Sequence, residues 1–115
     1  MAVIDWEQFN DNFQYYDKSI ILEVINIFFE EYDDRIATLQ KNINENDFAS
    51  LAFNAHSLKS VIANYMAPSA YECTRKLEEL AKNNSGDGIK EVFSQLKSTT
   101  QELIHELGDY VQKLE

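Results

Sequence analysis

Residues 18–44, KSIILEVINIFFEEYDDRIATLQKNIN, carry the pattern that decides the fold. Apolar side chains recur there at intervals of three and four residues, which places them along one face of an α-helix. They are Ile21, Val24, Ile25, Phe28, Phe29, Tyr32, Ile36, Leu39 and Ile43. The stretch therefore predicts an amphipathic helix of about seven turns, and Asp17 stands where an N-cap residue is expected.

The segments on either side have the same period. In residues 1–14, three aromatic residues at helical spacing predict a short leading helix with Asp5 as its N-cap: Trp6, Phe9 and Phe13. NENDF at residues 44–48 reads as a turn, with Asp47 capping the next helix. The inner face of that next helix is formed by Phe48, Leu51, Ala55, Leu58, Ile62 and Tyr65.

Two further helices complete the chain. Pro68 stops the preceding helix and suits the first turn of a fourth. The inward residues of the fourth helix are Ala70, Cys73, Thr74, Leu77, Leu80 and Ala81. NNSGDG at residues 83–88 predicts a loop. The last helix then continues to the C-terminus with Ile89, Val92, Phe93, Leu96, Leu103, Ile104, Leu107, Val111 and Leu114 on its apolar face.

No segment alternates as a half-buried strand would, so we expect an all-α protein. Long helices joined by short connections predict an antiparallel up-down-up-down four-helix bundle, with the short additional N-terminal helix covering one end. The 115 residues suffice for one hydrophobic core, and we expect residues 1–115 to form a single domain.

The composition excludes several classes of function. The formal charge is −10, from 20 acidic and 10 basic residues, so the surface repels phosphate backbones and nucleic acid is not an expected partner. No run of about 18 apolar residues is present, so we expect no membrane insertion. The N-terminal MAVIDWEQF is unlike a signal peptide, and the single cysteine, Cys73, suits a reducing compartment. We expect a cytoplasmic monomer.

A histidine stands beside the apolar stripe in AHSLKSVIANYM, residues 55–66. On a helical wheel with Ala55 at zero, the inner face centres near about −30° and His56 falls at about +100°, on the shoulder of the stripe. Its neighbours on that shoulder are small: Ala52, Ser60 and Ala63. A bulky partner can therefore approach the ring, and the large apolar Phe53 lies beyond it.

Lys59 follows His56 by three residues, so the two are adjacent on the helix surface. Side chains lean toward the helix N-terminus, which brings Lys59 toward His56. Its ammonium favours the neutral, nucleophilic ring and could also balance a phosphoryl group carried on that ring. The alternative is that His56 and Lys59 are ordinary solvated surface residues.

The run from residue 55 to residue 82, AHSLKSVIANYMAPSAYECTRKLEELAK, resembles the signature of histidine-containing phosphotransfer (HPt) domains. That signature combines A-H-x-L-K on a bundle helix with a leucine-acidic pair on the next helix, here Leu77-Glu78. The resemblance implies that His56 is the phosphoacceptor, reacting through Nε2, and that Lys59 balances the phosphoryl charge. It also implies that Glu78 orients His56 through Nδ1 and that Lys82 lies near the site.

The resemblance further implies a phosphocarrier that passes a phosphoryl group between receiver-domain aspartates. The partners would be response-regulator receiver domains and a hybrid sensor histidine kinase. The chain has no P-loop or Gly-rich nucleotide loop, so we expect no autokinase activity and no cofactor. The expected docking residues are Ala52, Phe53, Ser60, Ala63, Lys82 and Phe9. For Trp6 and Phe13 we favour packing of the N-terminal helix onto the bundle.

Two positions depart from the family pattern. Ser60 and Met66 stand where the family commonly has glycine. Ser60 is still small, so access to the histidine should persist, whereas Met66 suggests a differently built turn before Pro68. Both bear on the fit of the partner more than on the reaction.

Two other functions compete with phosphotransfer. A helical adaptor would not depend on His56. A metal-binding bundle could use Glu102 and His105, an E-x-x-H motif of the kind found in di-iron carboxylate bundles. Such a site needs a second motif, but Phe53 stands where its glutamate should precede His56. We therefore expect no metal site.

Overall fold

The computed structural model describes residues 2–115, and Met1 lies outside the described residues. Within that range the chain forms helices and no strands. The elements are α1 (Trp6–Phe13), α2 (Lys18–Asn44), α3 (Phe48–Ile62), the short 3₁₀ helix η1 (Ala63–Tyr65), α4 (Pro68–Lys82) and α5 (Ile89–Leu114). The predicted all-α class is confirmed.

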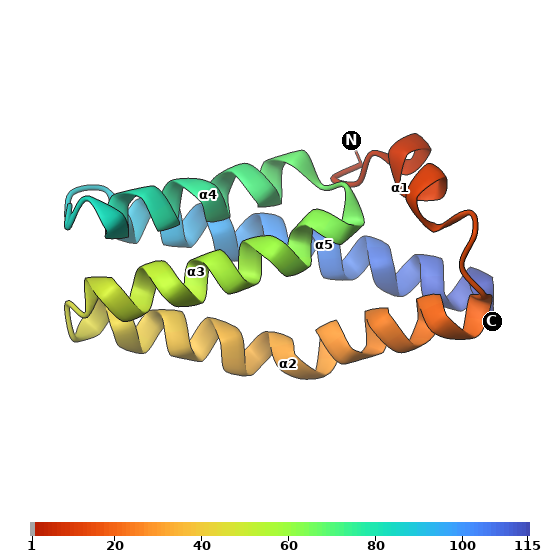
Figure 1. Cartoon of the computed structure of the whole chain (residues 1–115), viewed down its shortest axis with the longest axis horizontal. Helices are drawn as coiled ribbons and strands as arrows, with labels where there is room; N and C mark the ends of the chain where they lie inside the picture. Colours follow the sequence, from red (N-terminus) through yellow and green to blue (C-terminus); the bar gives the residue numbers. More distant parts are fainter. Residues whose placement is uncertain (1) are drawn as a thin grey trace.

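The four long helices run alternately up and down along a bundle of 42 × 24 × 20 Å (Figure 1). α3 packs against both α2 and α4, and α5 packs against both α4 and α2, so the four helices close a ring around one core. α1 crosses one end of the bundle, where it meets the corner between α3 and α4 (Figure 1) and packs its aromatic side chains against Tyr110 of α5. This is the predicted four-helix bundle with an additional N-terminal helix.

The core is formed by the residues that the three- and four-residue spacing places inward. Ile25, Leu58, Leu77 and Leu103 are 0 or 1% exposed, one from each long helix. Burial of each such side chain stabilises the fold by about 1.5–3 kcal/mol. Phe13 is buried in the same cluster, as its predicted packing role requires, and the half-buried Trp6 packs against it.

The helix ends follow the predicted caps in two of three cases. The carboxylates of Asp5 and Asp47 accept hydrogen bonds from Gln8 N at 3.2 Å and Ser50 N at 3.1 Å. Asp17 is the N-cap residue of α2, but its side chain makes no capping hydrogen bond. Only its main-chain carbonyl accepts, from Ile20 N and Ile21 N.

The corner between α3 and α4 is held by the N-terminal segment. Met66 adopts the left-handed conformation with φ of 52°, which turns the chain from η1 into Pro68. Its carbonyl accepts a hydrogen bond from Asp5 N at 2.7 Å. Because an L-residue with positive φ is strained, glycine would suit this position, which explains in backbone terms why glycine is common there in the family the sequence resembles.

Candidate functional site

His56 lies in the middle of α3 with 60% of its side chain exposed. Ala55, the preceding residue, is fully buried, so the helix turns its apolar face inward and carries His56 on the shoulder. Ala52 is half-buried and Ser60 is exposed, one turn away on either side. The small-residue surroundings predicted for the ring are therefore present, and they leave it open to a partner.

Glu78 on α4 holds the inner edge of the ring. Its Oε2 lies 2.9 Å from His56 Nδ1, within hydrogen-bonding distance, and the residue is only 3% exposed. A carboxylate only accepts hydrogen bonds, so the pairing requires Nδ1–H as the donor. In the neutral ring, Nε2 then carries a lone pair, and it makes no hydrogen bond to any residue from 2 to 115.

Two lysines contact the same carboxylate. Lys59 Nζ lies 2.7 Å from Glu78 Oε1, and Lys82 Nζ lies 3.0 Å from Oε2. The Lys59 contact is a close ion pair without the angular geometry of a directed hydrogen bond. The sequence predicted Lys59 leaning toward His56, whereas the structure pairs it with Glu78, which lies between the two helices.

The ion pairs decide the charge on Glu78. Burial disfavours its ionised form, but the contacts with Lys59, Lys82 and His56 outweigh burial and lower the pKa of Glu78 to about 2. The carboxylate is therefore ionised at neutral pH. With two lysines and one carboxylate, the cluster beside His56 carries a formal charge of +1 in a protein whose total charge is −10.

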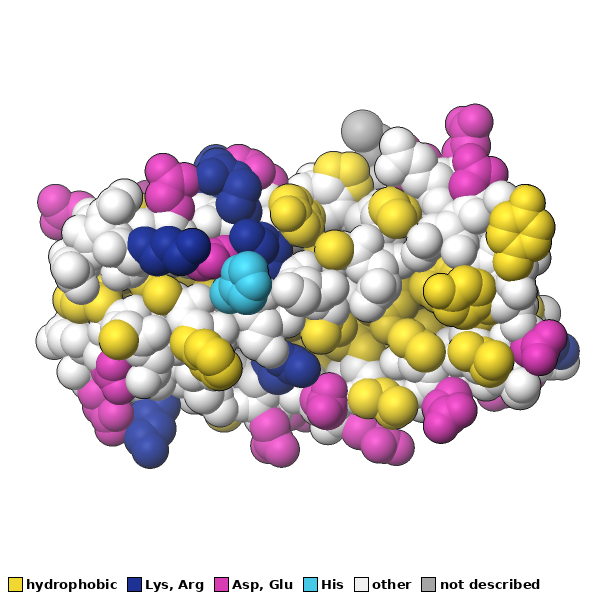
Figure 2. All heavy atoms as spheres, in the orientation of Figure 1, with side chains coloured by type: hydrophobic (Ala, Val, Ile, Leu, Met, Phe, Trp, Pro, Cys, Tyr) yellow, Lys and Arg dark blue, Asp and Glu magenta, His cyan; other side chains and the backbone are white. Residues whose placement is uncertain are grey.

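The surface next to this cluster is basic and slightly hollowed. A depression of about 210 Å³ is lined by Lys59, Arg75, Glu78, Glu79 and Lys82. Figure 2 shows a face of the molecule on which a histidine adjoins a carboxylate and several Lys or Arg side chains, while hydrophobic side chains extend toward the end that carries α1. The arrangement suits an anion held over an imidazole nitrogen.

Of the six predicted docking residues, four are exposed, Ala52 is half-buried and Phe9 is buried. Phe53 is 74% exposed, and Ser60, Ala63 and Lys82 are exposed as well, so all four lie on the accessible surface. The prediction for Phe9 is wrong, because its side chain is 0% exposed. It packs between Trp6, Phe13 and Tyr110, where α1 closes the end of the bundle.

Sequence reasoning missed two basic residues near the site, Arg75 in the depression beside Glu78 and Arg35 next to α3. Arg35 of α2 donates from Nη1 to Ser57 Oγ at 3.0 Å, which places a guanidinium beside the residue that follows His56. Its Nε is buried without a hydrogen-bond partner in the described part of the chain. No motif marks Arg35. The only signal was a basic residue next to an otherwise apolar helix stripe.

The two residues of the rival metal motif, Glu102 and His105, are both exposed on α5. Among residues 2–115, no group of three His, Cys, Asp or Glu side chains is placed to hold a metal ion. His105 is 80% exposed, and its Nε2 lies 3.7 Å from Asp109 on the outer surface of α5.

Cys73, expected to face the core, is half-buried against it. None of the helices in the described range is both long and apolar enough to cross a bilayer.

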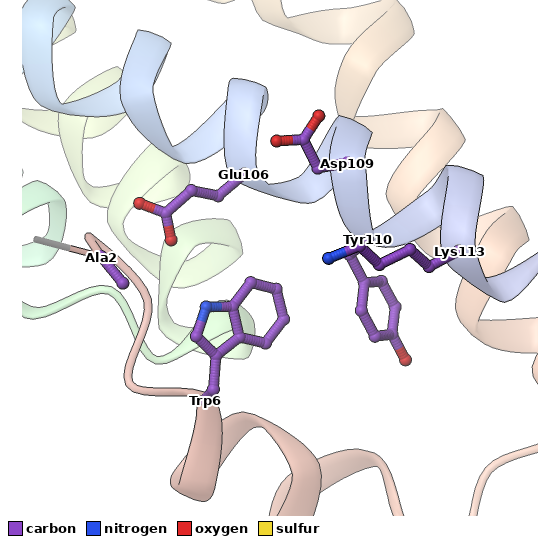
Figure 3. A pocket seen from close by; sticks show the side chains of 6 residues that line it. All are labelled: Ala2, Trp6, Glu106, Asp109, Tyr110 and Lys113. Carbon is purple, nitrogen blue, oxygen red and sulfur yellow. The ribbon is translucent and has the colours of Figure 1, made fainter.

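A wider hollow of about 530 Å³ lies away from His56, between α1 and α5 (Figure 3). Its walls include Trp6, whose ring stacks on Tyr110 with centroids 5.5 Å apart. Glu106 points from α5 toward the N-terminal segment, where its carboxylate accepts hydrogen bonds from Val3 N and Ile4 N. The carboxylate is thus already used in fixing the chain terminus, and we assign this hollow a structural role.

Comparison with known proteins supports the resemblance seen in the sequence. The family model described as "Hpt domain" matches residues 23–115, which include α3, α4 and the whole His56–Glu78 cluster. No curated protein and no solved structure matched the chain. Because the family match covers most of the chain and coincides with a four-helix bundle of the expected order, this protein belongs to the Hpt domain family, whose members carry phosphoryl groups in phosphorelays.

Proposed function

We propose that this protein relays a phosphoryl group between receiver-domain aspartates, with His56 Nε2 as the acceptor. The observation that carries the proposal is the contact between Glu78 Oε2 and His56 Nδ1 at 2.9 Å. It engages the inner nitrogen and leaves the outer one with its lone pair toward solvent. A nucleophile oriented by a third group in this way is the usual arrangement of a working histidine.

The transfer step needs no proton to leave the ring. Nε2 attacks the phosphorus of a receiver aspartyl phosphate, the new N–P bond forms, and the P–O bond to the aspartate breaks with its electron pair returning to the carboxylate. The ring keeps its Nδ1 proton and becomes cationic. Glu78, ionised because its pKa is lowered to about 2 by lysines that outweigh its burial, stabilises that cation. Attack by the next receiver's aspartate on the phosphorus reverses the sequence.

The two lysines have different freedom in this scheme. The Lys59 side chain is 19% exposed and is fixed against Glu78. The Lys82 side chain is 65% exposed and can turn from Glu78 toward a phosphoryl group on Nε2. We therefore assign Lys59 to holding the carboxylate and stabilising the phosphoryl at short range. Lys82 supplies the mobile countercharge and contacts the partner.

The docking surface is proposed to follow the exposed residues around His56. Phe53, Ala52, Ser60 and Ala63 offer an apolar and unobstructed approach, and the basic cluster beside them complements an acidic receiver pocket. On a chain of charge −10, a local basic patch also orients the encounter. The same surface would accept phosphoryl from the receiver of a hybrid sensor kinase.

The proposal includes the absence of an autokinase activity, since the sequence holds no nucleotide-binding loop. We further propose that the protein acts as a monomer in the cytoplasm, which its single cysteine permits.

A transfer assay with a matched pair of histidine variants tests the function. Receiver domains encoded in the same genome are phosphorylated with radiolabelled acetyl phosphate and mixed with the wild-type chain, with His56→Gln or with His105→Gln. These are the two histidines of the chain. The proposal predicts transfer to the wild type and to His105→Gln and none to His56→Gln. Equal labelling of His56→Gln would refute it, and a helical adaptor predicts no labelling of any variant.

A further inference from the structure

An apolar hollow lies on the same side of α3 as His56, at the corner between α3 and α4. It measures about 330 Å³ and is lined by Gln8, Ala63, Met66, Ala67, Pro68 and Tyr71. Ala63 follows His56 by seven residues, which in a helix means about 10 Å along the axis and only about 20° around it. The hollow therefore opens beside the ring rather than behind it.

We propose that this hollow holds one apolar side chain from the receiver domain that docks on His56, and that it sets which receivers bind well. The inference rests on the proposed function. A specific protein complex buries about 800 Å² on each partner, and a round patch of that area reaches about 16 Å from its centre. A receiver centred over His56 thus covers the hollow.

The lining indicates the chemistry of the occupant. None of the six lining residues carries a charge, and four of them are Ala63, Met66, Ala67 and Pro68, which offer only apolar side chains. The surface near Glu78 is basic by contrast. A partner that presents an acidic pocket to the basic end and an aliphatic or aromatic side chain to the hollow would match both. At about 330 Å³, the hollow has room for one aliphatic or aromatic side chain.

The walls of the hollow are held in place before any partner arrives. The carbonyl of Met66 is fixed by Asp5 N at 2.7 Å, and the carbonyl of Asn64 accepts a hydrogen bond from Asn12 Nδ2 at 3.1 Å. A preformed pocket loses little conformational freedom on binding, so an anchor side chain contributes more of its burial to affinity.

Part of the hollow and of its support lies outside the residues matched by the family model. The family match begins at residue 23, whereas Gln8 and the hydrogen-bond donors Asp5 and Asn12 lie in the N-terminal part outside it. Met66, where glycine is common in the family, adds a side chain to the wall. Differences at these positions would alter the choice of receiver without touching the reacting groups.

A filling substitution tests the proposal. Ala63 is exposed, so Ala63→Phe fills the hollow without burying a clash in the core. Ala37→Phe is the control, since Ala37 is an exposed alanine on α2, about 160° around that helix from the Arg35 that meets α3. Tyr71→Ala, which removes one wall, serves as an independent variant should Ala63→Phe fail to fold.

Transfer is measured from the acetyl-phosphate-treated receivers at low and at saturating receiver concentrations. Direct labelling of His56 by phosphoramidate reports the chemistry alone. We expect Ala63→Phe and Tyr71→Ala to lower the low-concentration rate about fivefold or more. The saturating rate, phosphoramidate labelling and Ala37→Phe should remain as in the wild type.

An unchanged low-concentration rate in the folded variants would overturn the inference while leaving the proposed function intact, because the wild type would still transfer. Failure of the wild type to accept phosphoryl at all would instead defeat the proposed function. A wild-type dimer that Ala63→Phe converts to a monomer would assign the hollow to a second copy of the chain and would also overturn the inference.

Discussion

Glu78 Oε2 and His56 Nδ1, on adjacent helices and 22 residues apart, lie 2.9 Å from each other. The carboxylate is almost fully buried, while most of the imidazole is exposed. The bundle thus provides a fixed acceptor for one edge of the ring and leaves the other edge to solvent.

The first prediction concerns the charge of Glu78. Glu78→Gln keeps a hydrogen-bond acceptor for Nδ1 but removes the negative charge that stabilises a cationic phosphorylated ring. We expect the initial rate of phosphoramidate labelling of His56 to fall by about tenfold, or about 1.4 kcal/mol in transition-state stabilisation. Glu79→Gln is the control, because Glu79 is the adjacent exposed carboxylate and pairs with Arg75. Equal rates in the two variants would show that the charge of Glu78 does not act on His56.

The second prediction concerns acid stability. The pKa of Glu78 is lowered to about 2 by ion pairs that outweigh its burial, whereas an unfolded glutamate titrates near 4.5. Between these values the unfolded chain binds more protons, so the contribution of Glu78 is complete above pH 4.5 and is lost as the pH falls toward 2. The shift corresponds to about 3 kcal/mol.

Denaturant unfolding of wild type and Glu78→Gln from pH 7 to pH 2.5 measures this contribution. Other carboxyl groups titrate in both proteins, so the difference between the two curves isolates Glu78. We expect the free energies of unfolding to differ at pH 7 and to converge as the pH falls. A difference that stays constant over the whole range would contradict the assigned pKa shift.

The third prediction concerns Met66, which has φ of 52°. Met66→Gly removes the backbone strain, worth about 1 kcal/mol, but also loses the packing of a half-buried side chain. These terms oppose each other, so stability should stay within about 1 kcal/mol of wild type. Met66→Val loses packing and adds a β-branched residue at positive φ, and we expect it to cost about 2 kcal/mol. Thermal unfolding compares the two, and a Met66→Gly variant less stable than Met66→Val would be inconsistent with the strain.

The fourth prediction concerns the attachment of the N-terminal segment by Glu106, which accepts from Val3 N and from Ile4 N, the latter at 3.1 Å. Glu106→Ala removes both acceptors and should destabilise the protein by about 1–2 kcal/mol. Hydrogen exchange should accelerate at the amides of residues 3 and 4, with phosphoramidate labelling of His56 unchanged. Unaltered exchange at these two amides would show that the carboxylate does not hold the segment.

The bundle could be predicted from the sequence because each long helix has one apolar face, and a single proline and one glycine-containing loop mark two of its connections. The shoulder position of His56 also follows from the wheel alone. Glu78 is different, since its own helix places it on a flank and only the packing of α4 against α3 buries it. The contact of Glu78 with His56 was therefore predicted from the family resemblance and not from the periodicity of the sequence.

Tertiary contacts also explain why the sequence-based expectations for Phe9 and Lys59 differ from the structure and why Arg35 was not predicted. Phe9 was expected at the docking surface as part of an apolar patch with Phe53, but Trp6, Phe13 and Tyr110 enclose it. Lys59 was expected beside His56 because the two share a helix, but a buried carboxylate attracts an ammonium more strongly than a neutral ring does. The Arg35–Ser57 contact joins two helices, and no local pattern predicts it.

The most direct test of the central claim is to determine which ring nitrogen of His56 carries the proton and which carries the phosphorus, before and after phosphorylation. Proton–nitrogen and phosphorus NMR of the ¹⁵N-histidine-labelled protein, treated with phosphoramidate, identifies the nitrogen bonded to phosphorus. The account predicts a free ring protonated at Nδ1, then a single phosphohistidine at His56 with phosphorus coupled to Nε2 and the Nδ1 proton retained. Phosphorus on Nδ1 of His56, or on His105, would contradict it.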